Sequence, residues 1–216
     1  MFQVRFHGRG GQGVGTAAEL LASAAFGEDR HAQAFPSFGS ERMGAPVMSF
    51  CRIDDQPIRT HEPVTEPDAL IIQDPTLLHQ ADIFGGFRGV APPGQQSAGL
   101  GPNGYMLVNS ARGFAELGLD EFVQGFRRDR LLVVPASSLA MTHLGRPLPG
   151  AALLGGFAAL TWAVSLDSVL AAINERFTGK VAEGNAAAAR AAFDFVRDER
   201  EALTRKAQTG EARTDA

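Results

Sequence analysis

Gly8-Arg9-Gly10-Gly11-Gln12-Gly13-Val14-Gly15 is the stretch of this 216-residue sequence that decides its fold. The apolar segment before it, residues 2–6, predicts a β-strand, and the alanine-rich segment after it, residues 14–26, predicts an α-helix. Five glycines in eight positions leave the connecting turn almost without side chains. Backbone N–H groups can then approach an anion at the positive end of the helix. We therefore predict a phosphate-binding turn, with a glycine turn that binds no ligand as the alternative.

The glycine spacing narrows the class of phosphate ligand. From Gly8 onward it fits G-x-G-x-x-G, the pattern of dinucleotide sites. A site for NAD also needs an acidic residue at the end of the second strand, about 20 residues further on. Here Glu28 and Asp29 precede the next predicted strand, residues 31–38, and Arg42 follows it. An arginine at that place favours a ligand with an additional phosphate, such as NADP or coenzyme A, over NAD.

Strand and helix patterns alternate along the rest of the chain. The predicted strands are residues 2–6, 31–38, 46–53, 69–73, 105–109 and 131–134, and the predicted helices are 14–26, 76–84, 137–143, 151–163, 166–177 and 181–206. We also expect a hairpin over residues 51–58 and a loop over residues 85–104. The fold class is therefore α/β: a Rossmann-like, mostly parallel sheet with helices on both faces and a helical C-terminal third. Residues 1–206 are expected to form a single domain, followed by a polar tail, residues 207–216.

Composition excludes several classes of protein. A net charge of −4 and a pI near 5.7 give no electrostatic footprint for nucleic acid. The longest apolar run, residues 151–164, is shorter than the roughly 18 residues a membrane span requires. Met1 leads directly into the first predicted strand, so we expect no signal peptide and a cytoplasmic protein. The one cysteine, Cys51, cannot form a disulfide framework or hold an iron–sulfur cluster by itself.

Four single residues are weaker candidates. Cys51 lies in a predicted strand with no histidine or lysine beside it, so we predict a buried, unreactive thiol. His7 directly precedes the glycine turn, where either a phosphate contact or a structural role is open. Asp74 follows a strand and either caps the next helix or faces a ligand. Ser137 lacks the G-x-S-x-G turn of a hydrolase nucleophile.

Three stretches of the sequence carry a family resemblance. They are Gly8-Arg-Gly-Gly-Gln-Gly-Val14 with the helix after it; Gln33-Ala-Phe-Pro-Ser-Phe-Gly-Ser-Glu-Arg-Met-Gly-Ala-Pro-Val47, leading into Phe50-Cys-Arg-Ile-Asp-Asp55; and Glu66-Pro-Asp-Ala-Leu-Ile-Ile-Gln-Asp-Pro-Thr-Leu-Leu78. Together they cover most of residues 1–80. With them the chain resembles the gamma subunit of the pyruvate:ferredoxin oxidoreductase, or 2-oxoacid:acceptor oxidoreductase, family. The second stretch is similar to the pyruvate-type branch, not to the indolepyruvate branch.

The resemblance implies a complex and a role within it. Such enzymes oxidatively decarboxylate a 2-oxoacid, here pyruvate first, on thiamine diphosphate with Mg²⁺, pass electrons through [4Fe–4S] clusters to ferredoxin and form an acyl-CoA. It implies that thiamine diphosphate and the clusters lie on partner subunits (alpha, beta and a ferredoxin-like delta), and that this chain is inactive alone. For the gamma chain it implies coenzyme A contacts at Gly8, Arg9, Gly10, Gly11, Gln12, Gly13, Ser40, Glu41 and Arg42, and no catalytic residue or metal ligand. Two positions depart from the family pattern: Met43 replaces a common second arginine, and Gly150 replaces a common asparagine.

Two other function classes stay open at this point. A free-standing NADP-dependent reductase fits the glycine pattern and Arg42, but the only tyrosine, Tyr105, is not part of a Tyr-x-x-x-Lys proton donor. A structural subunit whose turn binds no ligand is the third class.

Overall fold

Strand β1 lies in the middle of a six-stranded sheet of order β2-β3-β1-β4-β5-β6. A computed structural model describes residues 1–37, 43–79, 82–87 and 103–209. The strands are β1 (Phe2–Arg9), β2 (His31–Pro36), β3 (Pro46–Asp54), β4 (Ala69–Ile72), β5 (Tyr105–Asn109) and β6 (Leu131–Val134). β1, β4, β5 and β6 pair in parallel, whereas β3 is antiparallel to both β1 and β2. Five strands therefore share one direction, which confirms the mostly parallel sheet.

The hairpin expected over residues 51–58 is wrong in its pairing. The turn exists, since the backbone N–H of Gln56 donates to Asp54 Oδ1 at 3.1 Å, but residues 57–58 form no strand. Both edges of β3 are already paired, one with β1 and one with β2, so no third strand can add to it. The hairpin partner of β3 is β2.

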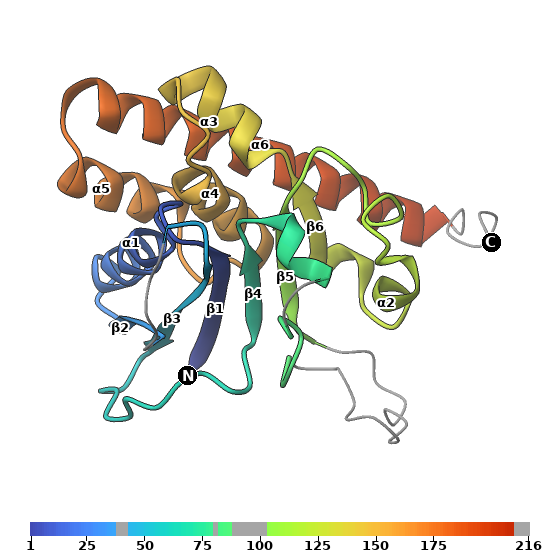
Figure 1. Ribbon diagram of the computed structural model, residues 1–216, viewed down its shortest axis with the longest axis horizontal. Helices are drawn as coiled ribbons and strands as arrows, with labels where there is room; N and C mark the ends of the chain where they lie inside the picture. Colours follow the sequence, from blue (N-terminus) through green and yellow to red (C-terminus); the bar gives the residue numbers. More distant parts are fainter. Residues whose placement is uncertain (38–42, 80–81, 88–102, 210–216) are drawn as a thin grey trace.

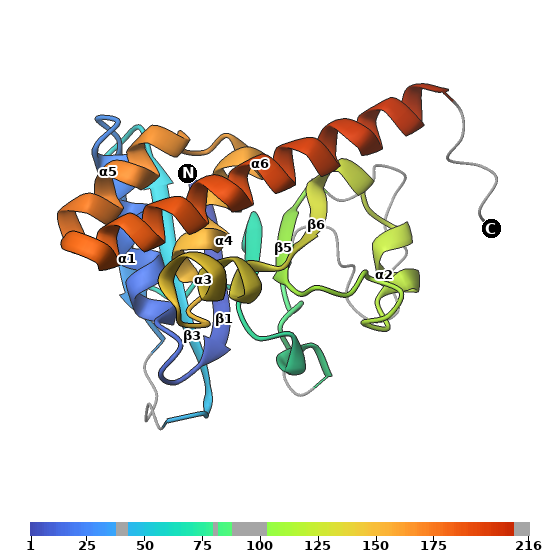
Figure 2. The same ribbon diagram turned by 90° about the horizontal axis from the view of Figure 1, so that it is seen from above.

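The helices follow the predicted order with two differences. They are α1 (Val14–Phe26), α2 (Asp120–Gln124), α3 (Ala136–Leu144), α4 (Gly150–Thr161), α5 (Leu166–Arg176) and α6 (Gly179–Thr209), with 3₁₀ turns η1 (Pro75–His79) and η2 (Arg128–Arg130). Within the expected helix 76–84 the structure describes the 3₁₀ turn η1 and the non-helical residues 82–84, and residues 80–81 lie outside the described residues. The short α2 and η2 were not predicted. α6 runs across the whole molecule and extends past β6 (Figures 1 and 2). Most of the expected loop 85–104, and residues 210–216 of the expected tail, lie outside the described residues.

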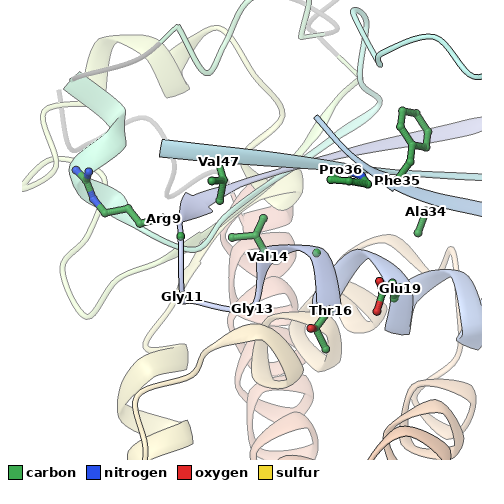
Figure 3. Close-up of a pocket in the computed structure, with 12 residues that line it drawn as sticks. Arg9, Gly11, Gly13, Val14, Thr16, Glu19, Ala34, Phe35, Pro36 and Val47 are labelled. Atoms are coloured by element: carbon green, nitrogen blue, oxygen red, sulfur yellow. The ribbon is translucent and has the colours of Figure 1, made fainter. Parts of the chain in front are cut away.

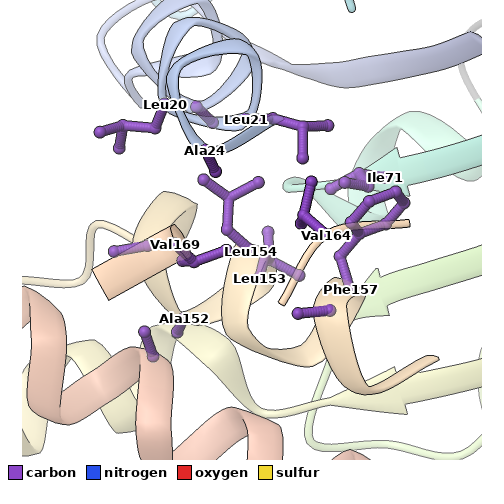
Figure 4. Packing of buried hydrophobic residues seen from close by; sticks show 14 of the residues in the cluster. Leu20, Leu21, Ala24, Ile71, Ala152, Leu153, Leu154, Phe157, Val164 and Val169 are labelled. Carbon is purple, nitrogen blue, oxygen red and sulfur yellow. The ribbon is translucent and has the colours of Figure 1, made fainter. Parts of the chain in front are cut away.

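One face of the sheet packs against α1, α4 and α6, and α5 packs against these three helices. α4 is apolar on all sides because it is enclosed: Leu153, Leu154 and Phe157 contact α1 and the sheet, while its other side meets α6 (Figure 4). Gly155 makes that second contact possible, since a Cβ placed on it would lie 1.9 Å from the carbonyl oxygen of Ala189. This layer fixes where α1, α4 and α6 begin, and those beginnings form the site described below.

The opposite face is covered in two ways. Over β4 and β5, the side chains of Leu70, Ile72 and Met106 pack against η1, α2 and the segments around them. Helices therefore lie on both faces, although the long ones gather on one. Over β1 the described residues form no helix; there the buried guanidinium of Arg5 donates to the carbonyl oxygens of Val64, Ile83 and Gly85 and holds these loops on the sheet. Among the described residues, no helix combines the length and the apolar character needed to cross a membrane.

Candidate functional site

The glycine turn is shorter than its sequence pattern. Gly8 and Arg9 belong to β1, where they pair with Val47 and Pro46 of β3. Gly10 follows and is also held to the chain before β3, because its N–H donates to Ala45 O at 2.9 Å and its carbonyl accepts from Gly44 N–H at 3.0 Å. The free part of the turn is therefore residues 11–13. Gly11 (φ 91°) and Gly13 (φ 72°) both have left-handed backbone conformations that favour glycine.

The turn presents an open helix N-terminus. Gly13 is the N-cap of α1, no side chain caps it, and the first turn holds no acidic residue. The first helical hydrogen bond runs from Ala17 N–H to Gly13 O. The N–H groups of residues 14–16 therefore have no carbonyl acceptor within the helix. These donors and the helix dipole favour an anion at the turn.

A cavity of 520 Å³ opens beside this turn, between α1 and the strands β2 and β3. Gly11, Gly13 and Val14 line one end of it, and Phe35, Pro36 and Val47 line the wall opposite (Figure 3). Glu19 lies further along α1 and adds a negative charge at the far end. The arrangement suits a ligand whose anionic part lies at the turn and whose apolar part extends toward Phe35.

The side chains of Arg9 and Gln12 are held by the protein itself. Arg9 points away from the cavity toward η1, where its Nη2 donates to Thr76 Oγ1 at 2.7 Å and its Nε lies 3.2 Å from Asp74 Oδ2 (Figure 3). Gln12 Oε1 accepts from the backbone N–H of Arg9, and its Nε2 donates to Asp74 Oδ2 at 2.9 Å. Both side chains therefore shape the turn, and the donors at α1 that they leave open are backbone N–H groups.

Asp74 is the centre of that network. Burial would raise its pKa, but hydrogen bonds from Thr76 and Gln12 and the charge of Arg9 outweigh burial and hold the pKa below its ordinary value. Asp74 also accepts from the backbone N–H of Thr76, so it caps η1. The capping role proposed from sequence is confirmed, and the same carboxylate holds the glycine turn.

The structure describes only some of the other residues that the sequence singled out. Ser40, Glu41 and Arg42 lie outside the described residues. Met43 is 88% exposed and forms an isolated β-bridge with Gly10. Gly8 serves packing, because a Cβ on it would lie 2.6 Å from Val14 Cγ2. Cys51 is fully buried, as predicted, and burial raises the pKa of its thiol; its lack of reactivity stays a prediction.

A second cavity was not predicted from sequence. It measures 420 Å³, shares Gly11, Gly13 and Thr16 with the first, and lies between α1 and the beginnings of α4 and α6. Arg146 and Lys180 line it. The local pattern gave no signal for it, because its walls come from segments far apart in the sequence. The pointers in the sequence were Gly145, Pro147 and Pro149 before α4 and Gly179 at the start of α6.

Comparison with known proteins agrees with the geometry. The model of the family described as pyruvate ferredoxin/flavodoxin oxidoreductase matches residues 3–195. The chain is 43% identical, over 90% of its length and 96% of the relative, to the pyruvate/ketoisovalerate oxidoreductases common subunit gamma of Thermococcus kodakarensis. The crystal structure of pyruvate oxidoreductase subunit PORC from Thermotoga maritima is similar, with TM-score 0.71 and 30% identity over 89% of this chain and 95% of that one. A 2-oxoglutarate:ferredoxin oxidoreductase from Magnetococcus marinus, solved with 2-oxoglutarate, coenzyme A and succinyl-CoA bound, shares the fold (TM-score 0.65, 17% identity, 94% of this chain, 31% of that one).

Proposed function

Since this chain belongs to the pyruvate ferredoxin/flavodoxin oxidoreductase family and is a gamma-type subunit of a 2-oxoacid oxidoreductase, we propose that its glycine turn binds coenzyme A for that complex. The complex oxidatively decarboxylates a 2-oxoacid to acyl-CoA and CO₂ and passes the electrons to ferredoxin. The gamma chain supplies binding and subunit contacts, has no activity alone and works in the cytoplasm.

The open N-terminus of α1 is the observation that carries this proposal. Its uncapped N–H groups, the left-handed Gly11 and Gly13, and the absence of an acidic residue in the first turn of α1 favour a phosphate group at the turn. Coenzyme A carries a pyrophosphate and a further phosphate beside long, less polar arms. Two cavities on either side of the turn, 520 and 420 Å³, give such arms room. The contacts we propose are the backbone of residues 11–13, held in place by Gly8, Arg9, Gly10 and the side chain of Gln12, with Ser40, Glu41 and Arg42.

The redox chemistry belongs to partner subunits in this proposal. One cysteine cannot supply the four thiolates of a [4Fe–4S] cluster. Within the part of the chain that the structure describes, no group of three or more His, Cys, Asp or Glu side chains is placed to hold a metal ion. We therefore assign thiamine diphosphate, its Mg²⁺ and the clusters to alpha, beta and ferredoxin-like delta subunits. When bound there, thiamine diphosphate supplies the decarboxylation.

Pyruvate is the 2-oxoacid that we propose first, on the wording of residues 33–47. The relative from T. kodakarensis is named as a subunit common to pyruvate and ketoisovalerate oxidoreductases. A gamma chain of this type can thus serve more than one substrate, which supports a 2-oxoacid pocket formed by the other subunits.

The test is a Gly13→Val substitution in the assembled complex. A branched side chain at φ 72° strains the turn and occupies the approach to its N–H groups, while no other atom lies within 4 Å of the new Cβ. We expect a raised KM for coenzyme A with an unchanged KM for the 2-oxoacid. Gly118→Val is the matched control, because Gly118 has φ 70° but lies away from both cavities. Unchanged coenzyme A kinetics in an assembled Gly13→Val complex, or turnover of NADPH by the isolated chain, would overturn the proposal.

A further inference from the structure

The thioether of Met43 lies on the glycine turn. Its Sδ atom stands 2.5 Å, and its Cε atom 3.6 Å, from the point where a Cβ of Gly11 would be. The sulfur therefore covers Gly11 on the side where any other residue would carry its side chain. Gly11 lines both cavities, so the sulfur lies beside a residue that the two cavities share.

The backbone around Met43 is fixed to the turn. Met43 forms an isolated β-bridge with Gly10. The N–H of Gly44 donates to Gly10 O at 3.0 Å, and the N–H of Gly10 donates to Ala45 O at 2.9 Å. Arg9 Nη1 also donates to Gly44 O at 3.1 Å. Because these bonds hold the chain on both sides of the bridge, a chemical change in the side chain of Met43 takes place at the turn.

Met43 is also the most exposed of the five methionines. Its side chain is 88% exposed, and the other values are 58% for Met1, 50% for Met141, 37% for Met48 and 0% for Met106. Oxidants dissolved in water reach an exposed thioether more readily than a covered one, and methionine oxidation is a common and reversible modification of proteins. Met43 therefore combines the greatest access to oxidants with a contact to the glycine turn.

We propose that Met43 is a site of reversible oxidation by hydroperoxides, and that its sulfoxide weakens the binding of coenzyme A at the glycine turn. The inference rests on the proposed function and adds a regulation of the same site. In the reaction the sulfur gives two electrons to hydrogen peroxide, whose O–O bond breaks; one oxygen atom forms the S–O bond and the other leaves as water. A dithiol reverses the step through a methionine sulfoxide reductase: the dithiol becomes a disulfide, and the oxygen leaves as water.

The sulfoxide opposes an anion at the turn for two reasons. Its oxygen carries partial negative charge and accepts hydrogen bonds, whereas a thioether is only a weak acceptor. Donors are available next to it: among the described residues no hydrogen bond uses the N–H of Gly11, and the N–H groups of residues 14–16 have no acceptor within α1. The sulfoxide oxygen therefore competes with a phosphate for these N–H groups and also repels its charge.

The first experiment oxidises the full chain before assembly, so that the partner subunits never meet the oxidant. The chain is treated with hydrogen peroxide, freed from it and combined with the untreated subunits. Peptide mass spectrometry should show Met43 oxidised faster than Met141, because it is more exposed. Calorimetric titration with coenzyme A, without 2-oxoacid, should then give a Kd about 5- to 10-fold higher, the size of one hydrogen bond. Methionine sulfoxide reductases with a dithiol should restore the original Kd.

Two variants of Met43 separate its oxidation from that of the other methionines. Met43→Leu keeps an apolar side chain of similar size and leaves every other methionine in place, so its Kd should be the same before and after peroxide. Met43→Gln carries an amide oxygen near the position of the sulfoxide oxygen and should raise the Kd without any oxidant. Its melting temperature should stay unchanged, because the side chain is exposed. Met141→Gln is the matched control, since Met141 is exposed but lines neither cavity, and its Kd should not change.

The two proposals fail in different ways. If Met43 is oxidised and the Kd stays the same, or if the Met43→Leu complex loses as much affinity to peroxide as the parent, the inference about Met43 is wrong and the binding of coenzyme A by the parent still supports the proposed function. If the untreated parent complex shows no binding of coenzyme A at all, the proposed function is wrong and the regulation by Met43 is lost with it.

Discussion

The guanidinium of Arg9 and the carboxylate of Asp74 lie 3.2 Å apart, Nε to Oδ2, and this pair holds the end of β1 to the residue that precedes η1. The same carboxylate accepts hydrogen bonds from Gln12 and from the backbone and hydroxyl of Thr76. One acidic side chain therefore fixes both flanks of the glycine turn. The turn has its shape before any ligand binds, which lowers the entropy lost on binding.

Replacing Asp74 with alanine should loosen the turn. The variant removes four contacts to a mostly buried carboxylate, and we expect the free energy of unfolding to fall by about 1–2 kcal/mol. Urea unfolding of the isolated chain measures this. Asp55→Ala is the control, because Asp55 also pairs with an arginine, Arg30, but its side chain is 82% exposed. Its loss should stay below about 0.5 kcal/mol, and equal losses for the two variants would contradict the role given to Asp74.

His7 should make the chain acid-sensitive. Burial first, and the charge of Arg5 second, lower the pKa of His7 to about 3, and its Nε2 accepts a hydrogen bond from Arg5 Nε at 3.0 Å. The unfolded chain takes up this proton near pH 6.5, whereas the folded chain stays neutral there. Stability should therefore fall as the pH drops from about 6.5 toward 3, by at most about 1.4 kcal/mol per pH unit for this one group.

His7→Gln is the matched variant for that prediction. A glutamine oxygen can accept the same hydrogen bond from Arg5 and does not titrate. Urea unfolding at pH 7, 6, 5 and 4 should show a smaller loss for the variant than for the parent chain. Parallel curves would mean that His7 is not the group responsible.

Cys51 should resist alkylation in the folded chain. It is fully buried in β3, and burial raises the pKa of its thiol, so little reactive thiolate reaches the solvent. Iodoacetamide at pH 8 should modify it only after unfolding in urea, as mass spectrometry of this single-cysteine chain can follow. Fast modification of the native chain would show that the strand opens locally.

Local patterns in the sequence predicted much of this fold. The strand, glycine turn and helix of residues 2–26 follow from adjacent residues, as do the buried strand β4 and the apolar α4. Strand pairing depends on distant residues, which is why the wrong partner was predicted for β3. The turn after Asp54 has the right residues for a hairpin, but β1 and β2 already occupy both edges of β3.

The same distinction between local and distant residues decides which site residues could be predicted. Gly11 and Gly13 were predicted correctly as turn residues, because their conformational role is local. Arg9 was predicted as a coenzyme A contact, which stays a prediction; its side chain turns to Asp74, which no local pattern pairs with it. Arg146 and Lys180 escaped prediction for the same reason, since the folding of α4 against α6 brings them to one cavity.

Gly155 should tolerate no side chain. It lies in α4 where that helix crosses α6, and a Cβ on it would stand 1.9 Å from the carbonyl oxygen of Ala189, which is backbone and cannot move alone. Helix propensity favours alanine over glycine by about 1 kcal/mol, so a Gly155→Ala chain that gains stability would be governed by helix propensity. A chain that loses stability would be governed by the packing of α4 against α6. We expect packing to win: Gly155→Ala should destabilise the chain by about 2 kcal/mol or more, because α6 must shift away from α4. Gly125→Ala, whose new Cβ would meet nothing closer than 3.8 Å, should change stability by less than about 1 kcal/mol. A Gly155→Ala chain as stable as the parent in urea would show that the two helices do not touch through Gly155.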